Sequence, residues 1–103
     1  MPKFMYIYHG GKAPESPEEG AEVMAAWNAW FEGMGAAVVD GGNPAGMSKT
    51  VSASGVAEDG GANPVSGYSL VNAADHDAAV EMAKTCPILS DGGTVEVAEA
   101  MEM

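Results

Sequence analysis

Residues 4–8, Phe-Met-Tyr-Ile-Tyr, constrain the fold more than any other segment of this 103-residue chain. Successive side chains of a β-strand point to opposite faces, so this segment is apolar on both faces if it is a strand. One face would carry Phe4, Tyr6 and Tyr8, and the other Met5 and Ile7. The sequence therefore predicts a strand that must be covered on both sides, with His9 continuing the second face.

A long helix is predicted after this strand, beginning at Ser16. The residues Ser-Pro-Glu-Glu at 16–19 combine an N-cap serine, a proline at the first helical position and a glutamate that completes a capping box. Gly35 predicts the end of the helix. Between these signals, large apolar residues recur at helical spacing and form one broad stripe: Val23, Trp27, Trp30, Phe31 and Met34.

The rest of the chain repeats the order of strand, helix and strand. Residues 36–40, 67–73 and 94–98 predict three further strands. A second helix is predicted to begin after an N-cap at Asp75 and to end before Pro87, with one face made of Ala79, Met82, Ala83 and Cys86. Residues 47–66 are rich in Ser, Gly and Asn, and predict a loose loop or a small hairpin that extends the edge of the sheet.

Two such β-α-β units with right-handed crossovers predict a single α+β domain over residues 1–103. Its fold would be a ferredoxin-like βαββαβ sandwich, a four-stranded antiparallel sheet with both helices on one face. That arrangement leaves the other face of the sheet bare, although strand 4–8 is apolar there too. Because a large exposed apolar patch is a liability on a monomer, we expect two copies to pack sheet against sheet as a homodimer.

The charge balance excludes several classes of partner. The chain has 15 acidic and 4 basic residues, a net charge of −11. Such a surface repels phosphate backbones and anionic membranes, so nucleic acid and membrane surfaces are not expected as partners. Without a signal-peptide pattern or a long apolar run, a cytoplasmic location is expected.

Known cofactor and metal motifs are missing from the sequence. Its two histidines are far apart, and its single cysteine matches no metal-ligand spacing. The sequence contains no phosphate-binding loop, dinucleotide fingerprint or nucleophile elbow. No cofactor and no metal are therefore expected.

His9 and Asp40 are the candidate catalytic residues. The predicted strands that end at these residues run parallel, so both residues would reach the same rim of the sheet, with one strand between them. A carboxylate near an imidazole fixes its tautomer and raises its basicity, which gives a general base near neutral pH. Asn43 would add a hydrogen-bond donor, and Tyr8 and Tyr68 would form the pocket wall. The structural alternative is a strand-end histidine and an aspartate that stabilises the following turn.

The chain resembles the YCII-related family in five segments: FMYIYHGG, SPEEGAEVMAAWNAWFEGMGA, VVDGGNP, GYSLVNAADHDAAVEMAKTCPIL and GGTVEVAEAMEM. The resemblance covers nearly all of the chain apart from residues 47–63. It implies a dimeric α+β barrel with a cleft in each subunit. Many relatives carry Asp-Gly-Pro-Phe before the third strand, whereas this chain has Gly-Gly-Ala-Asn-Pro-Val-Ser-Gly-Tyr and lacks that signature.

The resemblance also implies two kinds of function. Some family members look like cofactor-free enzymes with a His–Asp pair, including a dehydrochlorinase of chlorinated hydroxyquinols, and others look associated with sigma factors. We therefore expect a homodimer that binds a small organic molecule, with acid–base isomerisation or elimination at His9 and Asp40. The alternative is a non-catalytic module that senses a metabolite or binds another protein.

Overall fold

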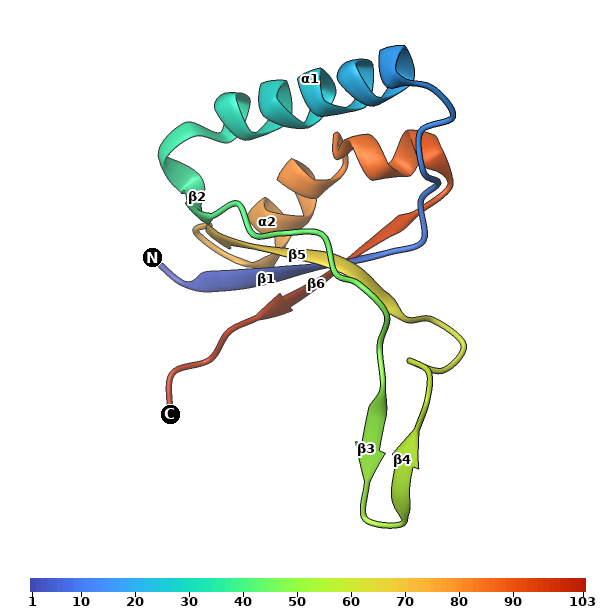
Figure 1. Cartoon of the computed structure of the whole chain (residues 1–103). Coiled ribbons are helices and arrows are strands. Elements are labelled where there is room, and N and C mark those ends of the chain that lie inside the picture. The colour runs from blue at the N-terminus through green and yellow to red at the C-terminus, as the bar shows by residue number, and fades with distance from the viewer.

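Two helices cover one face of a four-stranded antiparallel sheet in the computed structural model, which describes residues Met1–Met103 (Figure 1). The strand order is β2-β5-β1-β6, which is the order of the ferredoxin-like fold predicted from the sequence. The strands of this sheet are β1 (Lys3–His9), β2 (Val38–Asp40), β5 (Val65–Asn72) and β6 (Thr94–Glu99). The helical elements are α1 (Pro17–Met34), α2 (His76–Ala83) and the short 3₁₀ turns η1 (Gly35–Ala37) and η2 (Pro87–Asp91).

Helix α1 begins and ends as its sequence signals predict. The Ser16 hydroxyl accepts the backbone N–H of Glu19 at 3.1 Å, and Gly35 ends the helix with a positive φ of 56°. Trp30 is the buried member of its apolar stripe, and its indole N–H donates to the carbonyl of Met82 at 3.0 Å. This bond ties α1 to α2 across the helical layer. No helix of the chain has the length and apolar composition needed to span a membrane.

Two predicted boundaries are wrong. Strand β2 begins only at Val38, because the residues before it form η1. Helix α2 ends at Ala83, so Cys86 does not lie on the helix as predicted but in the turn before η2. Its thiol side chain is still buried, with 2% of the residue exposed.

Residues 47–66 contain a hairpin, but it does not extend the sheet as expected. Strands β3 (Thr50–Ser52) and β4 (Gly55–Ala57) pair with each other in a separate two-stranded sheet. The edge of the main sheet is already occupied there, because the loop after β2 runs along β5 and Pro44 bridges Gly67. The hairpin therefore projects from the sheet on the side away from the helices (Figure 1).

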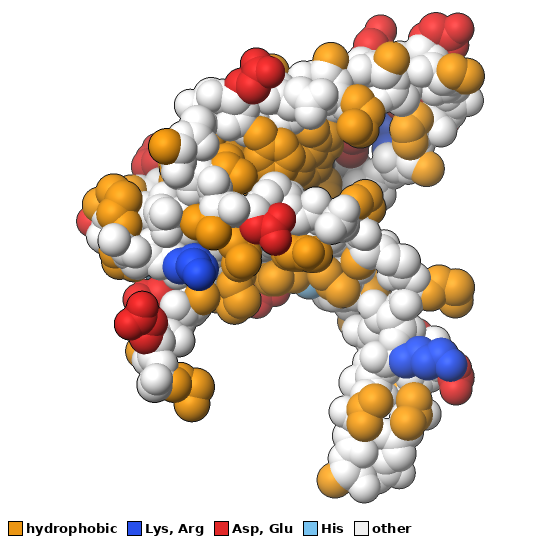
Figure 2. All heavy atoms as spheres, turned by 60° about the vertical axis from the view of Figure 1, so that its left-hand side comes forward, with side chains coloured by type: hydrophobic (Ala, Val, Ile, Leu, Met, Phe, Trp, Pro, Cys, Tyr) orange, Lys and Arg blue, Asp and Glu red, His pale blue; other side chains and the backbone are white.

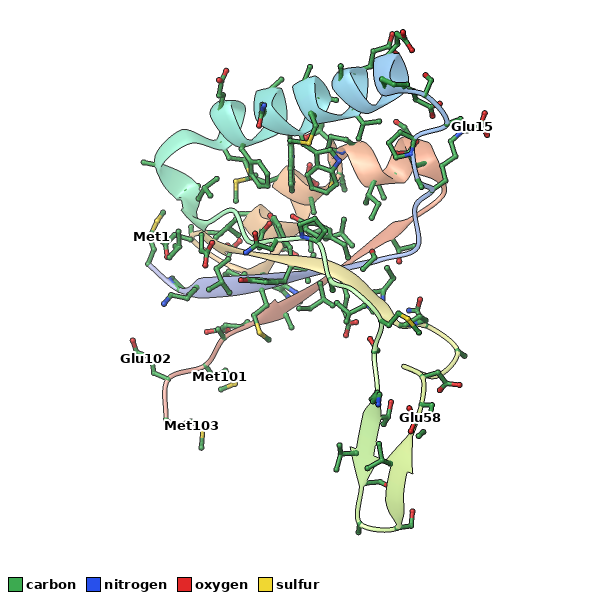
Figure 3. All side chains as sticks on the ribbon, in the orientation of Figure 1. Met1, Glu15, Glu58, Met101, Glu102 and Met103 are labelled. Atoms are coloured by element: carbon green, nitrogen blue, oxygen red, sulfur yellow. The ribbon has the colours of Figure 1, made fainter.

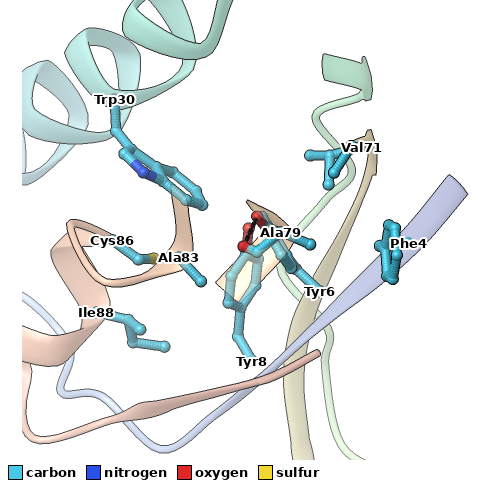
Figure 4. Packing of buried hydrophobic residues seen from close by; sticks show 10 residues of the cluster. Phe4, Tyr6, Tyr8, Trp30, Val71, Ala79, Ala83, Cys86 and Ile88 are labelled. Carbon is cyan, nitrogen blue, oxygen red and sulfur yellow. Dashed lines mark hydrogen bonds between the residues drawn. The ribbon is translucent and has the colours of Figure 1, made fainter. Parts of the chain in front are cut away.

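The core lies between the sheet and the helices (Figure 4). Three side chains of β1 point into it, and Phe4 and Tyr6 are the largest fully buried ones. The Tyr6 hydroxyl donates to the carbonyl of Ala79 and joins β1 to α2. The remaining buried apolar members are Tyr8, Trp30, Val71, Ala73, Ala79, Ala83, Cys86 and Ile88. Burial of the polar ends of the tyrosines is thus compensated by hydrogen bonds.

The second face of the sheet carries no helix. The strand register shows which residues lie on this face. Met5 lies between Leu70 and Ala98, and Ile7 lies between Tyr68 and Glu96. Met5, Ile7 and Leu70 are only partly buried, and 38% of Tyr68 is exposed. This surface of Met5, Ile7, Tyr68, Leu70 and Ala98 is called the bare face below.

Candidate functional site

His9 ends β1 on the bare face and forms a pair with Glu96 of β6. Its Nε2 lies 2.9 Å from Oε1 of Glu96, and its Nδ1 lies 3.2 Å from the carbonyl oxygen of Pro64. The pairing register shifts between Tyr8 and His9, so His9 lies opposite Val65. This bulge brings the segment before β5 over the imidazole, and only 8% of His9 is exposed.

Both hydrogen-bond partners of His9 are acceptors. A carbonyl oxygen and an ionised carboxylate cannot donate, so both ring nitrogens must carry protons to make the two bonds. The pKa of His9 is raised from its ordinary value of 6.5, chiefly by the hydrogen bond to Glu96, against an opposing effect of burial. The two acceptors therefore favour the imidazolium form of His9, and an imidazolium has no lone pair with which to accept a proton. Glu96, with 64% of its side chain exposed, is the accessible member of the pair.

This pairing makes stability depend on pH in a defined direction. Because the folded-state pKa of His9 is raised, its contribution is complete below pH 6.5 and is lost as pH rises through the raised pKa. Glu96→Gln should therefore destabilise the protein more at pH 5.5 than at pH 9. Because the pair is partly exposed, the loss at pH 5.5 should be less than about 1 kcal/mol. Urea unfolding of both proteins at the two pH values measures this difference. A destabilisation that is equal at both would contradict the pairing.

Asp40 is not in contact with His9, so the predicted pair is not formed. Asp40 lies opposite Leu70, which lies opposite Met5, so Asp40 is level with the start of β1. The four residues from Met5 to His9 correspond to about 13 Å along the strand, and the two intervening strand spacings add about 10 Å across the sheet. The Asp40 carboxylate instead accepts the backbone N–H of Gly42 at 2.8 Å. This is the turn-stabilising role set out above as the alternative.

The other candidate site residues lie on two faces of the sheet. Tyr68 lies on the bare face beside Ile7, on the same face as His9. Tyr8 points to the helices, where its ring meets Trp27 edge to face at a centroid distance of 5.0 Å. Asn43 is exposed in the loop after β2, and its carbonyl accepts the N–H of Tyr68 at 3.3 Å. One ligand pocket cannot be walled by both tyrosines.

Tyr8 belongs to a buried hydrogen-bond chain. Its hydroxyl donates to Ser69 at 2.7 Å, and the Ser69 hydroxyl donates to the carbonyl of Gly41 at 2.6 Å. Burial raises the pKa of Tyr8 well above its ordinary value of 10.0. A phenol held neutral in this way fastens the loop after β2 to the sheet and does not supply a base.

The glycines beside His9 make close backbone contacts. A Cβ on Gly93 would lie 2.7 Å from the carbonyl oxygen of His9 and 2.9 Å from the nitrogen of Gly11. Gly10 similarly approaches the backbone of Gly93. The absence of side chains at these glycines allows the end of β1 to approach the start of β6.

A separate groove of about 810 Å³ lies between α1 and the α2–η2 segment. This volume is in the range of small-molecule sites. Its floor is apolar and its charged lining residues are both acidic. The twelve lining residues are Glu22, Val23, Ala26, Ala29, Trp30, Gly33, Met34, Met82, Thr85, Pro87, Ser90 and Asp91. The groove lies in the helical layer and the sheet separates it from the bare face, so it is not part of the His9 site. Apolar side chains also gather beneath α1 (Figure 2).

Glu96 is the site residue that the sequence prediction missed. The alternating pattern Thr-Val-Glu-Val at 94–97 contained the signal, because it turns the two valines to the helices and the glutamate to the bare face. In the predicted topology this strand is the antiparallel neighbour of β1. The start of one therefore lies beside the end of the other, which brings Glu96 within reach of His9.

No family model matches the sequence, and no curated protein matches it. Among solved structures, the fold matches 5-chloro-2-hydroxyhydroquinone dehydrochlorinase from Burkholderia phenoliruptrix AC1100, in complex with 2,5-dihydroxybenzoquinone. The TM-score is 0.58 and the sequences are 16% identical, with 100% of this chain and 96% of that chain covered. At this identity the likeness establishes a shared fold.

Proposed function

We propose that the protein is a homodimer that binds a small organic molecule and performs acid–base chemistry on it without a cofactor, at the pair His9 and Glu96. The observation that carries this proposal is the buried imidazole of His9, which is hydrogen-bonded to the exposed carboxylate of Glu96. The fold shared with the dehydrochlorinase supports it, since that protein acts on a small hydroxylated aromatic compound. Membership of the YCII-related family and a cytoplasmic location belong to the same proposal.

Glu96 is the proposed general base. An ionised carboxylate in reach of solvent can take a proton from a phenol or from an activated carbon, whereas His9 in its charged form cannot. His9 holds the carboxylate by a hydrogen bond of 2.9 Å, and its positive charge favours an anion that develops nearby. In this proposal His9 keeps its predicted importance, but Glu96 replaces Asp40 as its partner and takes over the role of base.

The bare face supports the proposed dimer. Its partly buried apolar residues have no cover within the chain, although both faces of β1 are apolar. Packing two copies sheet against sheet would cover the bare faces of both copies, with the pair His9 and Glu96 at the margin of the contact, where the end of β1 meets the start of edge strand β6. Each chain is proposed to be one domain over residues 1–103, with residues 47–66 as an insertion.

A non-catalytic sensing or protein-interaction module is the second candidate. The observation in its favour is that both ring nitrogens of His9 are already hydrogen-bonded, as in a structural histidine. Such a module would keep its ligand affinity when Glu96 loses its charge. An enzyme would keep the affinity and lose turnover.

The proposed pair is tested by NMR titration of His9. In the wild type, its pKa should lie above 6.5, and in Glu96→Gln it should fall because the carboxylate is gone. Asp40→Asn is the matched control, a carboxylate-to-amide change at the predicted but unpaired partner, and should leave the titration unchanged. His76→Gln assigns the two histidine signals. A His9 titration that follows Asp40 and ignores Glu96 would overturn the proposed site.

A further inference from the structure

The projecting hairpin has an uncovered apolar tip. Residues 47–63, called the arm here, extend beyond the bare face on the side away from the helices (Figure 1), with Glu58 on the projecting hairpin (Figure 3). Val51 and Val56 pair directly across β3 and β4, so their side chains lie on the same face of the arm. They are 78% and 58% exposed.

Polar contacts join the two chain segments of the arm to each other, but they do not cover its valines. Lys49 pairs with Glu58 at 3.1 Å, and the Thr50 hydroxyl donates to the carbonyl of Asp59 at 2.7 Å. A two-stranded hairpin is at best marginally stable by itself in water. An arm that presents two adjacent valines to solvent therefore gains stability when another surface covers them.

The sheet alone offers little area for the proposed dimer. Four strands at a spacing of about 4.8 Å, and about 23 Å long as β1 is, give a projected face of roughly 440 Å². Stable protein interfaces bury about 800 Å² on each partner. Because β2 and β6 are shorter than β1, the contact area is smaller still. A second contact region would add to this area, and the arm projects on the side of the bare face, where a second copy would pack (Figure 1).

Charge favours a second copy of this chain as the occupant. Residues 50–57, which form the tip of the arm, contain no charged side chain in a protein of net charge −11. The five residues of the bare face are also uncharged, and the pair His9 and Glu96 lies toward the end of β1. These two regions can approach an equally acidic partner without adding repulsion. A nucleic acid or an anionic membrane would need basic residues that the tip lacks.

From these observations we infer that, in the homodimer, the arm of each copy packs against the main sheet domain of the other copy. This inference rests on the dimer proposed above. The contact is reciprocal about a two-fold axis, so each dimer has two arm contacts beside one sheet contact. The valine pair Val51 and Val56 is the apolar anchor of each arm contact.

The test compares the dimer dissociation constant of the wild type with that of Val51→Ser/Val56→Ser by sedimentation equilibrium. The double variant should raise this constant at least tenfold, with an unchanged far-UV circular dichroism spectrum. Met24→Ser is the matched control, because it removes an exposed apolar side chain from α1, where Met24 is 61% exposed. It should leave the dissociation constant unchanged.

Hydrogen exchange on the wild type gives a second measurement that needs no variant. Amides of residues 50–57 should become more protected as the concentration rises through the dissociation constant. The wild type could form a dimer whose dissociation constant is unchanged in the valine variant and whose arm amides gain no protection. That result would overturn the arm contact but would not contradict the dimer. A wild type that is monomeric at all concentrations would overturn both, and the His9 titration would then test the acid–base site separately.

Discussion

Replacing Gly42 by alanine is expected to destabilise the protein by about 2–5 kcal/mol, the sum of overpacking and of a left-handed backbone. Gly42 has a φ of +74°, and a Cβ built on it would lie 1.7 Å from the carbonyl oxygen of Tyr68. That oxygen belongs to the backbone of β5 and cannot rotate away as a side chain would. Alanine therefore has to push the loop after β2 off the sheet, which also weakens the bond between Tyr68 and Asn43.

Gly46→Ala is the matched control for this change. Gly46 lies in the same loop, but a Cβ there would meet no heavy atom within 4 Å. Its substitution should be neutral or should stabilise by up to about 1 kcal/mol, because alanine restricts the unfolded chain. Urea denaturation of both variants measures the difference. Equal stabilities would mean that the loop is not held against β5.

Local signals were sufficient to predict the fold. Ser16 and Gly35 mark the ends of α1 through interactions within a few residues of the chain, and such signals can be recognised in a single sequence. The two-residue alternation of β1 likewise distinguishes the core face of Tyr6 from the bare face of Ile7. Because right-handed crossovers leave few ways to join these elements, the strand order followed from them.

The candidate site was harder to predict because it depends on register. Whether Asp40 can reach His9 depends on where β2 ends along β5, and residue types do not fix that position. The bulge opposite His9 brings Pro64 over the ring, and it arises from a pairing shift that no local motif marked. Glu96 was predictable in principle, since alternation gives its face and the topology gives its neighbour.

The change of partner alters the chemistry and not only the residue list. A carboxylate that orients Nδ1 would leave Nε2 free as a base, which was the role expected for His9. Here Nδ1 donates to a carbonyl, and the carboxylate occupies Nε2. Both contacts favour the charged form of the ring, and the basic group exposed to a ligand is the carboxylate.

Glu96→Gln is therefore expected to lower kcat by about 10²–10⁴-fold for a phenol or activated carbon acid that the protein turns over, the usual contribution of a positioned general base. The amide keeps the size and the oxygen of the carboxylate but cannot accept a proton. The ligand dissociation constant should change little, because the side chain is retained in shape. Steady-state kinetics and calorimetric binding, run on the same compound, separate the two quantities.

His9→Gln and Asp40→Asn make this prediction specific. His9→Gln should also lower kcat and should shift the pH–rate profile, because it removes the positive charge beside the base. Asp40→Asn removes a carboxylate that holds only the turn at Gly42, so kcat and its pH profile should stay as in the wild type. If Asp40→Asn abolished turnover while Glu96→Gln preserved it, the base would lie near β2 and the acid–base role proposed for Glu96 would be wrong.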